Sequence, residues 1–157
     1  MRDPLDGYPD VERHSRRDGS PEAVQACLQP VKDALPAIRR LIEEVCTRKQ
    51  LFAVHTYLFQ SRAMGTCKPG SDIDVYLALE PHIHGETVDR HGVLYKDTGV
   101  KVICGEWAVA FFTDLPEPIK RRLAELRLDL FLGVEATPPA KAEYRGKPYY
   151  LDLEALP

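Results

Sequence analysis

The sequence of 157 residues contains no apolar run that approaches the roughly 20 residues needed to cross a bilayer. Its first 19 residues, MRDPLDGYPDVERHSRRDG, also lack the apolar core of a secretory signal peptide. These absences argue against a helical membrane protein and against export. We therefore expect a soluble, cytoplasmic protein with no membrane partner.

Closely spaced cysteines are missing as well. The four cysteines, Cys27, Cys46, Cys67 and Cys104, form no CxxC pair and have no spacing typical of a zinc ribbon or a small disulfide-rich domain. We expect four reduced thiols, in keeping with a cytosolic location.

A strong excess of positive charge is absent too. The chain has 21 Lys and Arg against 24 Asp and Glu, which gives a formal net charge of -3. A protein that coats duplex nucleic acid has the opposite imbalance, so any contact with nucleic acid has to come from a local patch. One candidate patch consists of Lys120, Arg121, Arg122 and Arg127, although basic residues late in a helix also complement the helix dipole.

The chain has the length of one globular domain. Residues 1–19 mix charge, glycine and proline without a period, which predicts a flexible tail. Apolar residues then recur at spacings of three and four from Val24 to Val45, which predicts an amphipathic helix with Ser20 as its N-cap. Pro30 and Pro36 fall inside this helix and predict a kink or two abutting helices.

Short segments rich in β-branched and aromatic residues follow, and they predict strands. The expected strands are residues 53–59, 72–79, 93–96, 100–104, 106–112 and 127–133, with a turn at 97–99. A short basic helix is expected over residues 119–126. The fold class is therefore α/β of the α+β kind, a mixed central sheet with helices on one face, over a domain of residues 20–135 with a C-terminal extension of 136–157.

Two carboxylates stand two residues apart in one of these strands. In DIDVYLAL, residues 72–79, Asp72 and Asp74 share one face of the strand, while the alternate residues are apolar. The apolar face supplies a core, so the acidic face is turned either to solvent or to a site. Carboxylates at this spacing can hold two divalent ions about 3.5 to 4 Å apart.

The loop before this strand contains groups that suit a triphosphate. It covers QSRAMGTCKPGS, residues 60–71, with glycines at Gly65 and Gly70 and polar side chains at Ser61 and Arg62. Backbone N–H groups of glycine-containing turns that open a helix bind phosphate. A polar loop that joins two strands without any ligand accounts for the same residues equally well on these grounds.

The segment QSRAMGTCKPGSDIDVYLAL resembles the signature of the DNA polymerase beta superfamily of nucleotidyltransferases, in which Gly-Ser, ten residues and Asp-x-Asp follow one another. Ten residues separate Ser61 from Asp72. The family also has a third carboxylate on a neighbouring strand, within a stretch of the form basic, apolar, Asp, apolar, and RLDLF with Asp129 fits that form. VKVICGEWAVAFF is similar to the paired strands that precede the third Asp in small family X polymerases. The resemblance covers residues 35–135.

This resemblance implies a nucleotidyltransferase palm, which moves a nucleoside monophosphate from an NTP or dNTP, ATP among them, to an acceptor hydroxyl and releases pyrophosphate. It implies two Mg2+ ions, replaceable by Mn2+, with Asp72 and Asp74 as ligands of both ions. Asp129 is implied as a ligand of the ion nearest the acceptor and as a candidate base. The residues implied to bind the nucleotide are Gln60, Ser61, Arg62, Gly70 and Ser71.

The acceptor and one alternative function stay open. The acceptor is a nucleic-acid 3′ end, as in small family X polymerases, a protein, as in minimal nucleotidyltransferase antitoxins paired with a toxin, or a small molecule. Gln60 stands where the family has a glycine, which lets the backbone approach the phosphates without a Cβ. The alternative is a catalytically silent palm in which Gln60 closes the pocket and the domain serves as a nucleotide-binding or protein-interaction module.

Two other groups of residues have simpler explanations. His82, His84 and His91 lack regular metal-site spacing and follow a proline, so we expect them in a loop rather than around zinc. Tyr149 and Tyr150 are expected in a C-terminal strand that clamps the domain rather than stacked on a base.

Overall fold

The computed structural model describes residues 21–68, 70–95, 100–134, 143–144, 147–148 and 150–156. The helices in these ranges are α2 Pro21–Lys49, α3 Ser61–Met64, α4 Pro81–His91, α5 Gly105–Phe111, α6 Glu117–Leu126 and the 3-10 helix η1 Leu153–Ala155. The strands are β1 Ala53–Phe59, β2 Ile73–Leu79, β3 Val93–Tyr95, β4 Val100–Ile103, β5 Leu128–Gly133, β6 Glu143–Tyr144, β7 Lys147–Pro148 and β8 Tyr150–Asp152. The expected tail and the expected turn at 97–99 lie outside the described residues.

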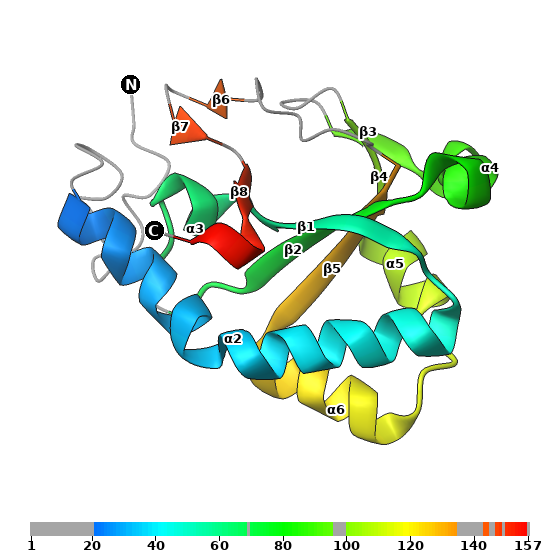
Figure 1. Ribbon diagram of the computed structural model, residues 1–157, viewed down its shortest axis with the longest axis horizontal. Coiled ribbons are helices and arrows are strands. Elements are labelled where there is room, and N and C mark those ends of the chain that lie inside the picture. Colours follow the sequence, from blue (N-terminus) through cyan, green and yellow to red (C-terminus); the bar gives the residue numbers. More distant parts are fainter. Residues whose placement is uncertain are drawn as a thin grey trace.

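Six of the strands form one mixed sheet in the order β3-β4-β5-β2-β1-β8, which crosses the middle of Figure 1. The central strands β2 and β5 run parallel, and the other neighbouring pairs of this sheet are antiparallel. The connection from β2 to β5 is long and contains α4, β3, β4, α5 and α6. The predicted α+β class with a mixed central sheet is confirmed.

Helix α2 follows the predicted amphipathic pattern as one continuous helix. It begins at Pro21, a position where the missing N–H of proline has no intrahelical partner to lose. Pro30 and Pro36 lie inside the helix on its exposed side, and the ribbon changes direction between its dark-blue first part and its cyan second part (Figure 1). Of the two forms predicted, the structure therefore has the single bent helix, because the lost hydrogen bonds face solvent.

The apolar face of the sheet packs against α2 and α6, as predicted. Each fully buried aliphatic side chain of this cluster contributes about 1.5 to 3 kcal/mol relative to exposure. Its members include Leu28, Ile38, Leu41, Val45, Ile73, Val75, Leu77, Ile119, Leu128, Leu130 and Leu132. Leu128 and Leu130, which flank Asp129 on β5, both belong to this core and fix the position of Asp129.

The opposite face of the sheet holds an aromatic cluster. Tyr57, Phe59, Tyr76 and Tyr150 are buried with ring centroids 4.9 to 6.2 Å apart. A Cβ at Gly133 would lie 2.5 Å from the Tyr76 hydroxyl oxygen, so the ring passes over the glycine because no side chain is there. The carboxylate face was expected to be exposed, and that prediction is wrong along most of β2, since Tyr76 on the same face as Asp74 is fully buried.

Strand β8 closes one edge of the sheet. It pairs antiparallel with β1, with Tyr150 opposite Phe59. The predicted C-terminal clamping strand is confirmed for Tyr150, while Tyr149 lies outside the described residues. Part of the expected C-terminal extension is thus a strand of the main sheet.

Two predictions of local structure are wrong. The segment EWAVAFF, predicted as a strand, lies largely in α5, because the chain leaves the sheet at Cys104 and Gly105 turns it with a φ of 58°. Val109 on α5 is 71% exposed. In a strand, the apolar residues of this segment would alternate between two faces, and both faces of the sheet would then need apolar cover. The segment HIHGETVDRH, predicted as a loop, belongs to helix α4, which begins at Pro81 with the Glu80 side chain accepting a hydrogen bond from the backbone N–H of His82.

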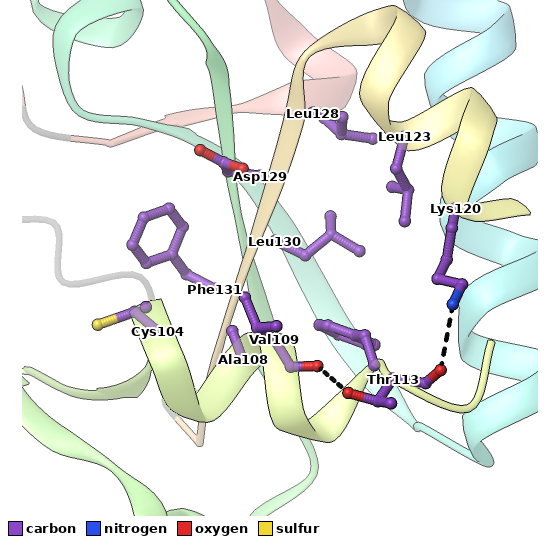
Figure 2. Close-up of a pocket in the computed structure, with 12 residues that line it drawn as sticks. Cys104, Ala108, Val109, Thr113, Lys120, Leu123, Leu128, Asp129, Leu130 and Phe131 are labelled. Carbon is purple, nitrogen blue, oxygen red and sulfur yellow. Dashed lines mark hydrogen bonds between the residues drawn. The ribbon is translucent and has the colours of Figure 1, made fainter.

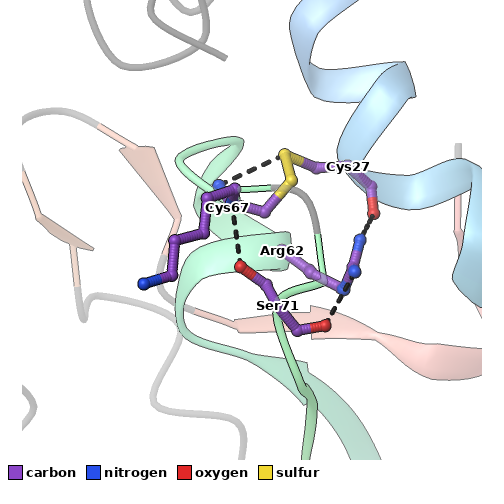
Figure 3. The surroundings of a disulfide bond; sticks show 5 residues. Cys27, Arg62, Cys67 and Ser71 are labelled. Atoms are coloured by element: carbon purple, nitrogen blue, oxygen red, sulfur yellow. Dashed lines mark hydrogen bonds between the residues drawn. A yellow bond between two sulfur atoms is a disulfide. The ribbon is translucent and has the colours of Figure 1, made fainter. Parts of the chain in front are cut away.

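The expectation of four reduced thiols is wrong for two of them. Cys27 on α2 and Cys67 after α3 form a disulfide across a sequence separation of 40 residues (Figure 3). Cys46 and Cys104 are free. The bond ties the loop that follows α3 to the first part of α2.

Candidate active site

Three carboxylates from two strands meet at one end of the sheet. Asp74 of β2 stands opposite Asp129 of β5 in the parallel register, so both side chains project from the same face. Asp72 directly precedes β2, and its charge acts on both Asp74 and Asp129.

The electrostatics of these carboxylates follow from their crowding. Burial raises the pKa of Asp74 to about 7, the charges of Asp129 and Asp72 add to the rise, and Arg62 opposes it. Desolvation also raises the pKa of Asp129, together with the charge and hydrogen bond of Asp72, while Arg127 lowers it. Burial and crowding thus favour the protonated forms of Asp74 and Asp129 unless a cation compensates their charges.

The donor set fits a divalent cation in its chemistry. The donors of these three residues are carboxylate oxygens, which Mg2+ and Mn2+ prefer. In their present positions, the His, Cys, Asp and Glu side chains of the described ranges make no group of three or more that could hold a metal ion. Asp72 instead contacts Arg127, whose Nε donates to Asp72 Oδ1 at 3.1 Å. Both side chains are about half exposed, and an exposed pair of this kind contributes at most about 1 kcal/mol, so Asp72 can turn toward a cation at small cost.

Gln60 and Ser61 lie at the same end of the sheet as the carboxylates. Phe59, the residue before Gln60, stands opposite Asp74 in the antiparallel β1–β2 register. Gln60 has a φ of 67° and a ψ of -136°, a conformation that glycine adopts freely and that strains a residue with a Cβ by about 1 to 3 kcal/mol. The backbone thus keeps a glycine conformation at the position where the family signature has glycine. Ser61 is half-buried at the first position of α3.

Arg62 and Ser71 hold the loop in place rather than face a ligand. The Arg62 side chain is buried, and its Nη1 and Nη2 donate to the carbonyl oxygens of Cys27 at 2.9 Å and Ser71 at 2.8 Å (Figure 3). The Ser71 hydroxyl oxygen accepts from the backbone N–H of Lys68 at 2.8 Å. Together with the Cys27–Cys67 bond, these contacts fix the loop between α3 and β2 against α2.

Gly70 brings the end of this loop next to Arg127. A Cβ at Gly70 would lie 3.7 Å from Arg127 Nη1, and Gly70 has a φ of 77°, where glycine is favoured. Of the predicted nucleotide-binding residues, Gln60 and Ser61 therefore lie at the carboxylate end of the sheet and Gly70 lies beside Arg127, whereas Arg62 and Ser71 hold the loop in place.

Two hollows meet at Asp129. One has a volume of about 560 Å³ and is lined by Cys104, Gly105, Ala108, Val109, Phe112, Thr113, Lys120, Leu123, Leu128, Asp129, Leu130 and Phe131 (Figure 2). The other has a volume of about 460 Å³ and is lined by Asp72, Leu123, Ala124, Arg127, Leu128 and Asp129. The lining residues of α5 could not be identified from the sequence, because the segment was predicted as a strand with no cavity beside it.

The predicted basic patch is largely neutralised by acidic neighbours. Lys120 pairs with Glu117 at 2.9 Å, Arg122 pairs with Glu44, and Arg127 pairs with Asp72. A nucleic-acid backbone would have to displace these partners in order to bind there.

The three histidines lie on α4, not in the predicted loop. His84 Nε2 accepts a hydrogen bond from the backbone N–H of Phe52 at 3.0 Å, and burial lowers the pKa of His84. His91 packs against Trp107 with ring centroids 5.1 Å apart. Contacts of this kind stabilise the fold and need no metal.

The chain matches no protein-family model, no curated protein and no solved structure. Among the described residues there is also no helix long and apolar enough to cross a membrane. A function for this protein therefore has to be argued from the carboxylates, the loop and the two hollows.

Proposed function

We propose that this protein is a nucleotidyltransferase of the DNA polymerase beta superfamily that transfers a nucleoside monophosphate from an NTP or dNTP to an acceptor hydroxyl. The observation that carries the proposal is the β2–β5 register, which sets Asp74 opposite Asp129 with Asp72 beside them. The family signature requires three carboxylates on neighbouring strands, and this chain brings together the three residues that match it. The raised pKa values of Asp74 and Asp129 are expected of carboxylates that are crowded together while no cation is bound.

The residues that would hold the divalent cations are Asp72, Asp74 and Asp129. Mg2+ or Mn2+ held by these residues would supply positive charge to the triphosphate and the leaving pyrophosphate and would favour ionisation of the acceptor hydroxyl. Arg127 adds a positive charge between the carboxylates and Gly70, on the side where an anionic triphosphate is expected. Ser61 follows Phe59 by two residues, and its hydroxyl is the candidate donor to a phosphate oxygen.

The test is transfer of label from α-labelled NTPs and dNTPs in the presence of Mg2+ or Mn2+. Separate reactions contain primer-template DNA, RNA, cell lysate or small hydroxyl compounds. Label is expected on one acceptor class with the wild-type protein and is expected to vanish with the Asp72→Asn/Asp74→Asn double variant. Asp89→Asn, on the exposed side of α4, serves as the matched control and should transfer normally.

Gln60 favours a second candidate, a silent palm that binds nucleotide without transferring it. Its Cβ stands at a backbone position of glycine type, where it would meet a phosphate that approaches closely. The silent palm predicts that nucleotides raise the melting temperature while no acceptor is labelled, and that Gln60→Gly gains activity. If no label is transferred and no nucleotide changes the melting temperature, both candidates are wrong.

A further inference from the structure

The larger hollow at Asp129 has walls made mainly of carbon. Figure 2 shows Ala108 and Val109 on α5, Leu123 on α6, and Leu130 and Phe131 on β5 around it. Its volume of about 560 Å³ lies within the range of roughly 300 to 1,000 Å³ that is typical of small-molecule sites.

The hollow exists because β4 covers only the end of β5. The two strands pair at Val102–Gly133 and Ile103–Leu132, after which the chain turns away into α5. In the described part of the chain, residues 128–131 of β5 have no strand on that side. The uncovered edge of β5, with its backbone N–H and C=O groups, forms one wall of the hollow beside Asp129.

The charges around the hollow exclude a strongly charged occupant. Apart from Asp129 and the Cys104 thiol, the only ionisable lining residue among those described is Lys120. The Lys120 Nζ is held by Glu117 at 2.9 Å and by the carbonyl oxygen of Thr113 at 3.3 Å. A phosphate or nucleic-acid backbone needs Lys or Arg side chains that are available to bind it, and a polycation needs several carboxylates. The lining of the hollow provides neither set of side chains.

The two hollows differ in chemistry where they meet. They share Leu123, Leu128 and Asp129, but the smaller one adds Asp72 and Arg127, whereas the larger one adds apolar side chains. A charged substrate on the side of Arg127 and an apolar substrate on the side of α5 would both reach Asp129.

We propose that the larger hollow binds the acceptor, and that the acceptor is a small uncharged molecule with an apolar ring or chain and a hydroxyl group that reaches Asp129. This inference rests on the proposed nucleotidyl transfer. The acceptor oxygen forms a bond to the α-phosphorus of the NTP, the bond from that phosphorus to the bridging oxygen breaks, and pyrophosphate leaves. The hydroxyl proton passes to a carboxylate oxygen of Asp129 and from there to water.

The hollow is tested first without any nucleotide. The probe is N-phenyl-1-naphthylamine, an uncharged aromatic dye whose fluorescence rises in apolar sites. Ala108→Phe fills the hollow, and Ala110→Phe places the same side chain at an exposed position of α5 outside it. The wild type and Ala110→Phe should bind the dye equally, and Ala108→Phe should weaken binding by about ten-fold or more, the effect expected when one good apolar contact region is lost. Equal binding by all three proteins would overturn the proposal.

The second test uses label transfer to uncharged aromatic and aliphatic alcohols, with primer-template DNA and a polyamine alcohol in parallel. We expect transfer to an uncharged alcohol, and Ala108→Phe should raise the KM for that alcohol while the affinity for ATP, measured by calorimetry, stays as in the wild type. Transfer to DNA alone overturns the acceptor assignment and leaves nucleotidyl transfer standing. Weaker ATP binding by Ala108→Phe with an unchanged acceptor KM also overturns it, since the hollow would then hold the nucleobase. Failure of the wild type to bind any nucleotide contradicts the transfer function itself, and the dye result still reports on the hollow.

A second pair of variants guards against a folding defect in Ala108→Phe. Val109→Lys puts a charge at the exposed rim of the hollow, and Ala110→Lys puts the same charge on α5 away from it. Val109→Lys should weaken binding of both dye and alcohol at an unchanged melting temperature, and Ala110→Lys should not. If the two lysine variants bind alike, the hollow is not the site.

Discussion

Replacement of Asp74 by Asn should stabilise the metal-free protein at pH 8. The folded protein raises the pKa of Asp74 from 3.8 to about 7, and each pKa unit corresponds to about 1.4 kcal/mol. The ionised carboxylate therefore lowers the free energy of unfolding by up to about 4 kcal/mol, an upper bound because Asp74 keeps some contact with solvent. Asn has nearly the same shape and no charge, so the variant lacks this penalty.

The effect of Asp74 has a defined pH window. Below about pH 4 the carboxyl is protonated in both the folded and the unfolded chain, so no penalty exists. Between pH 4 and 7 the unfolded chain has released its proton while the folded protein retains it, and stability falls as the pH rises. Above pH 7 the folded protein is also ionised and the full penalty is present. The transition is broad, because the pKa of the neighbouring Asp129 is also raised and the two carboxylates influence each other's titration.

The assay is urea unfolding in EDTA from pH 4 to pH 8 for the wild type, Asp74→Asn and the control Asp89→Asn. The difference between Asp74→Asn and the wild type should grow from near zero at pH 4 to a few kcal/mol at pH 8. Addition of Mg2+ at pH 8 should stabilise the wild type and have less effect on Asp74→Asn. Parallel stability curves for the wild type and Asp74→Asn over the whole range would refute the crowded-carboxylate argument.

Three further predictions follow from local geometry. Gly133→Ala should lower the free energy of unfolding by about 1 to 3 kcal/mol in urea titrations, because the new methyl group would lie 2.5 Å from the Tyr76 oxygen. Gln60→Gly should raise the urea midpoint by the equivalent of about 1 kcal/mol, because relief of the strain at φ 67° exceeds the added entropy of the unfolded glycine. Reduction of the Cys27–Cys67 bond by dithiothreitol, or its removal by Cys27→Ser/Cys67→Ser, should lower the melting temperature by an amount equivalent to at most about 4 kcal/mol, as expected for a separation of 40 residues.

Each of these changes has a matched control. Gly85→Ala has no atom within 4 Å of its new methyl group and lies inside α4, so it should stabilise by up to about 1 kcal/mol where Gly133→Ala destabilises. Gln50→Gly, at a φ of 53° just after α2, measures the general effect of glycine at a positive φ. Cys46→Ser removes a free thiol and should leave the response to dithiothreitol unchanged. A destabilising Gly85→Ala, or a Gln60→Gly effect no larger than that of Gln50→Gly, contradicts the geometric reasons given.

The central part of the fold was predictable because its signals are local and periodic. The alternation in DIDVYLAL predicts strand β2 and its apolar face, although Tyr76 and Ala78 on the other face are buried as well, and the spacing from Val24 to Val45 predicts α2. The placement of Asp129 beside Asp74 came from the resemblance to a family, since neither residue contains any information on which strand pairs with which.

The errors came from features that depend on the assembled chain. Trp107 and Phe111, residue types common in strands, occur in α5 because β4 ends at Ile103 and the chain turns away from the edge of β5 at Gly105. The disulfide depends on α3 bringing Cys67 to the side of Cys27, and a separation of 40 residues gives no pattern in the sequence. The larger hollow follows from the same early end of β4, so no inspection of its lining residues one by one could have located it.

The parallel pairing of β2 and β5 also separates the residues that form the acidic centre from those that form the wall of the larger hollow. The carboxylates stand at the starts of β2 and β5, and a long excursion that leaves β2 after Leu79 and returns at Leu128 joins the two strands. That excursion supplies α5 and α6, hence most of the wall of the larger hollow, and none of the carboxylates. A graft that replaces only residues between α4 and the start of β5 could therefore give the protein a differently shaped wall while the acidic centre stays as it is. The topology therefore allows the wall of the larger hollow to change independently of the carboxylates.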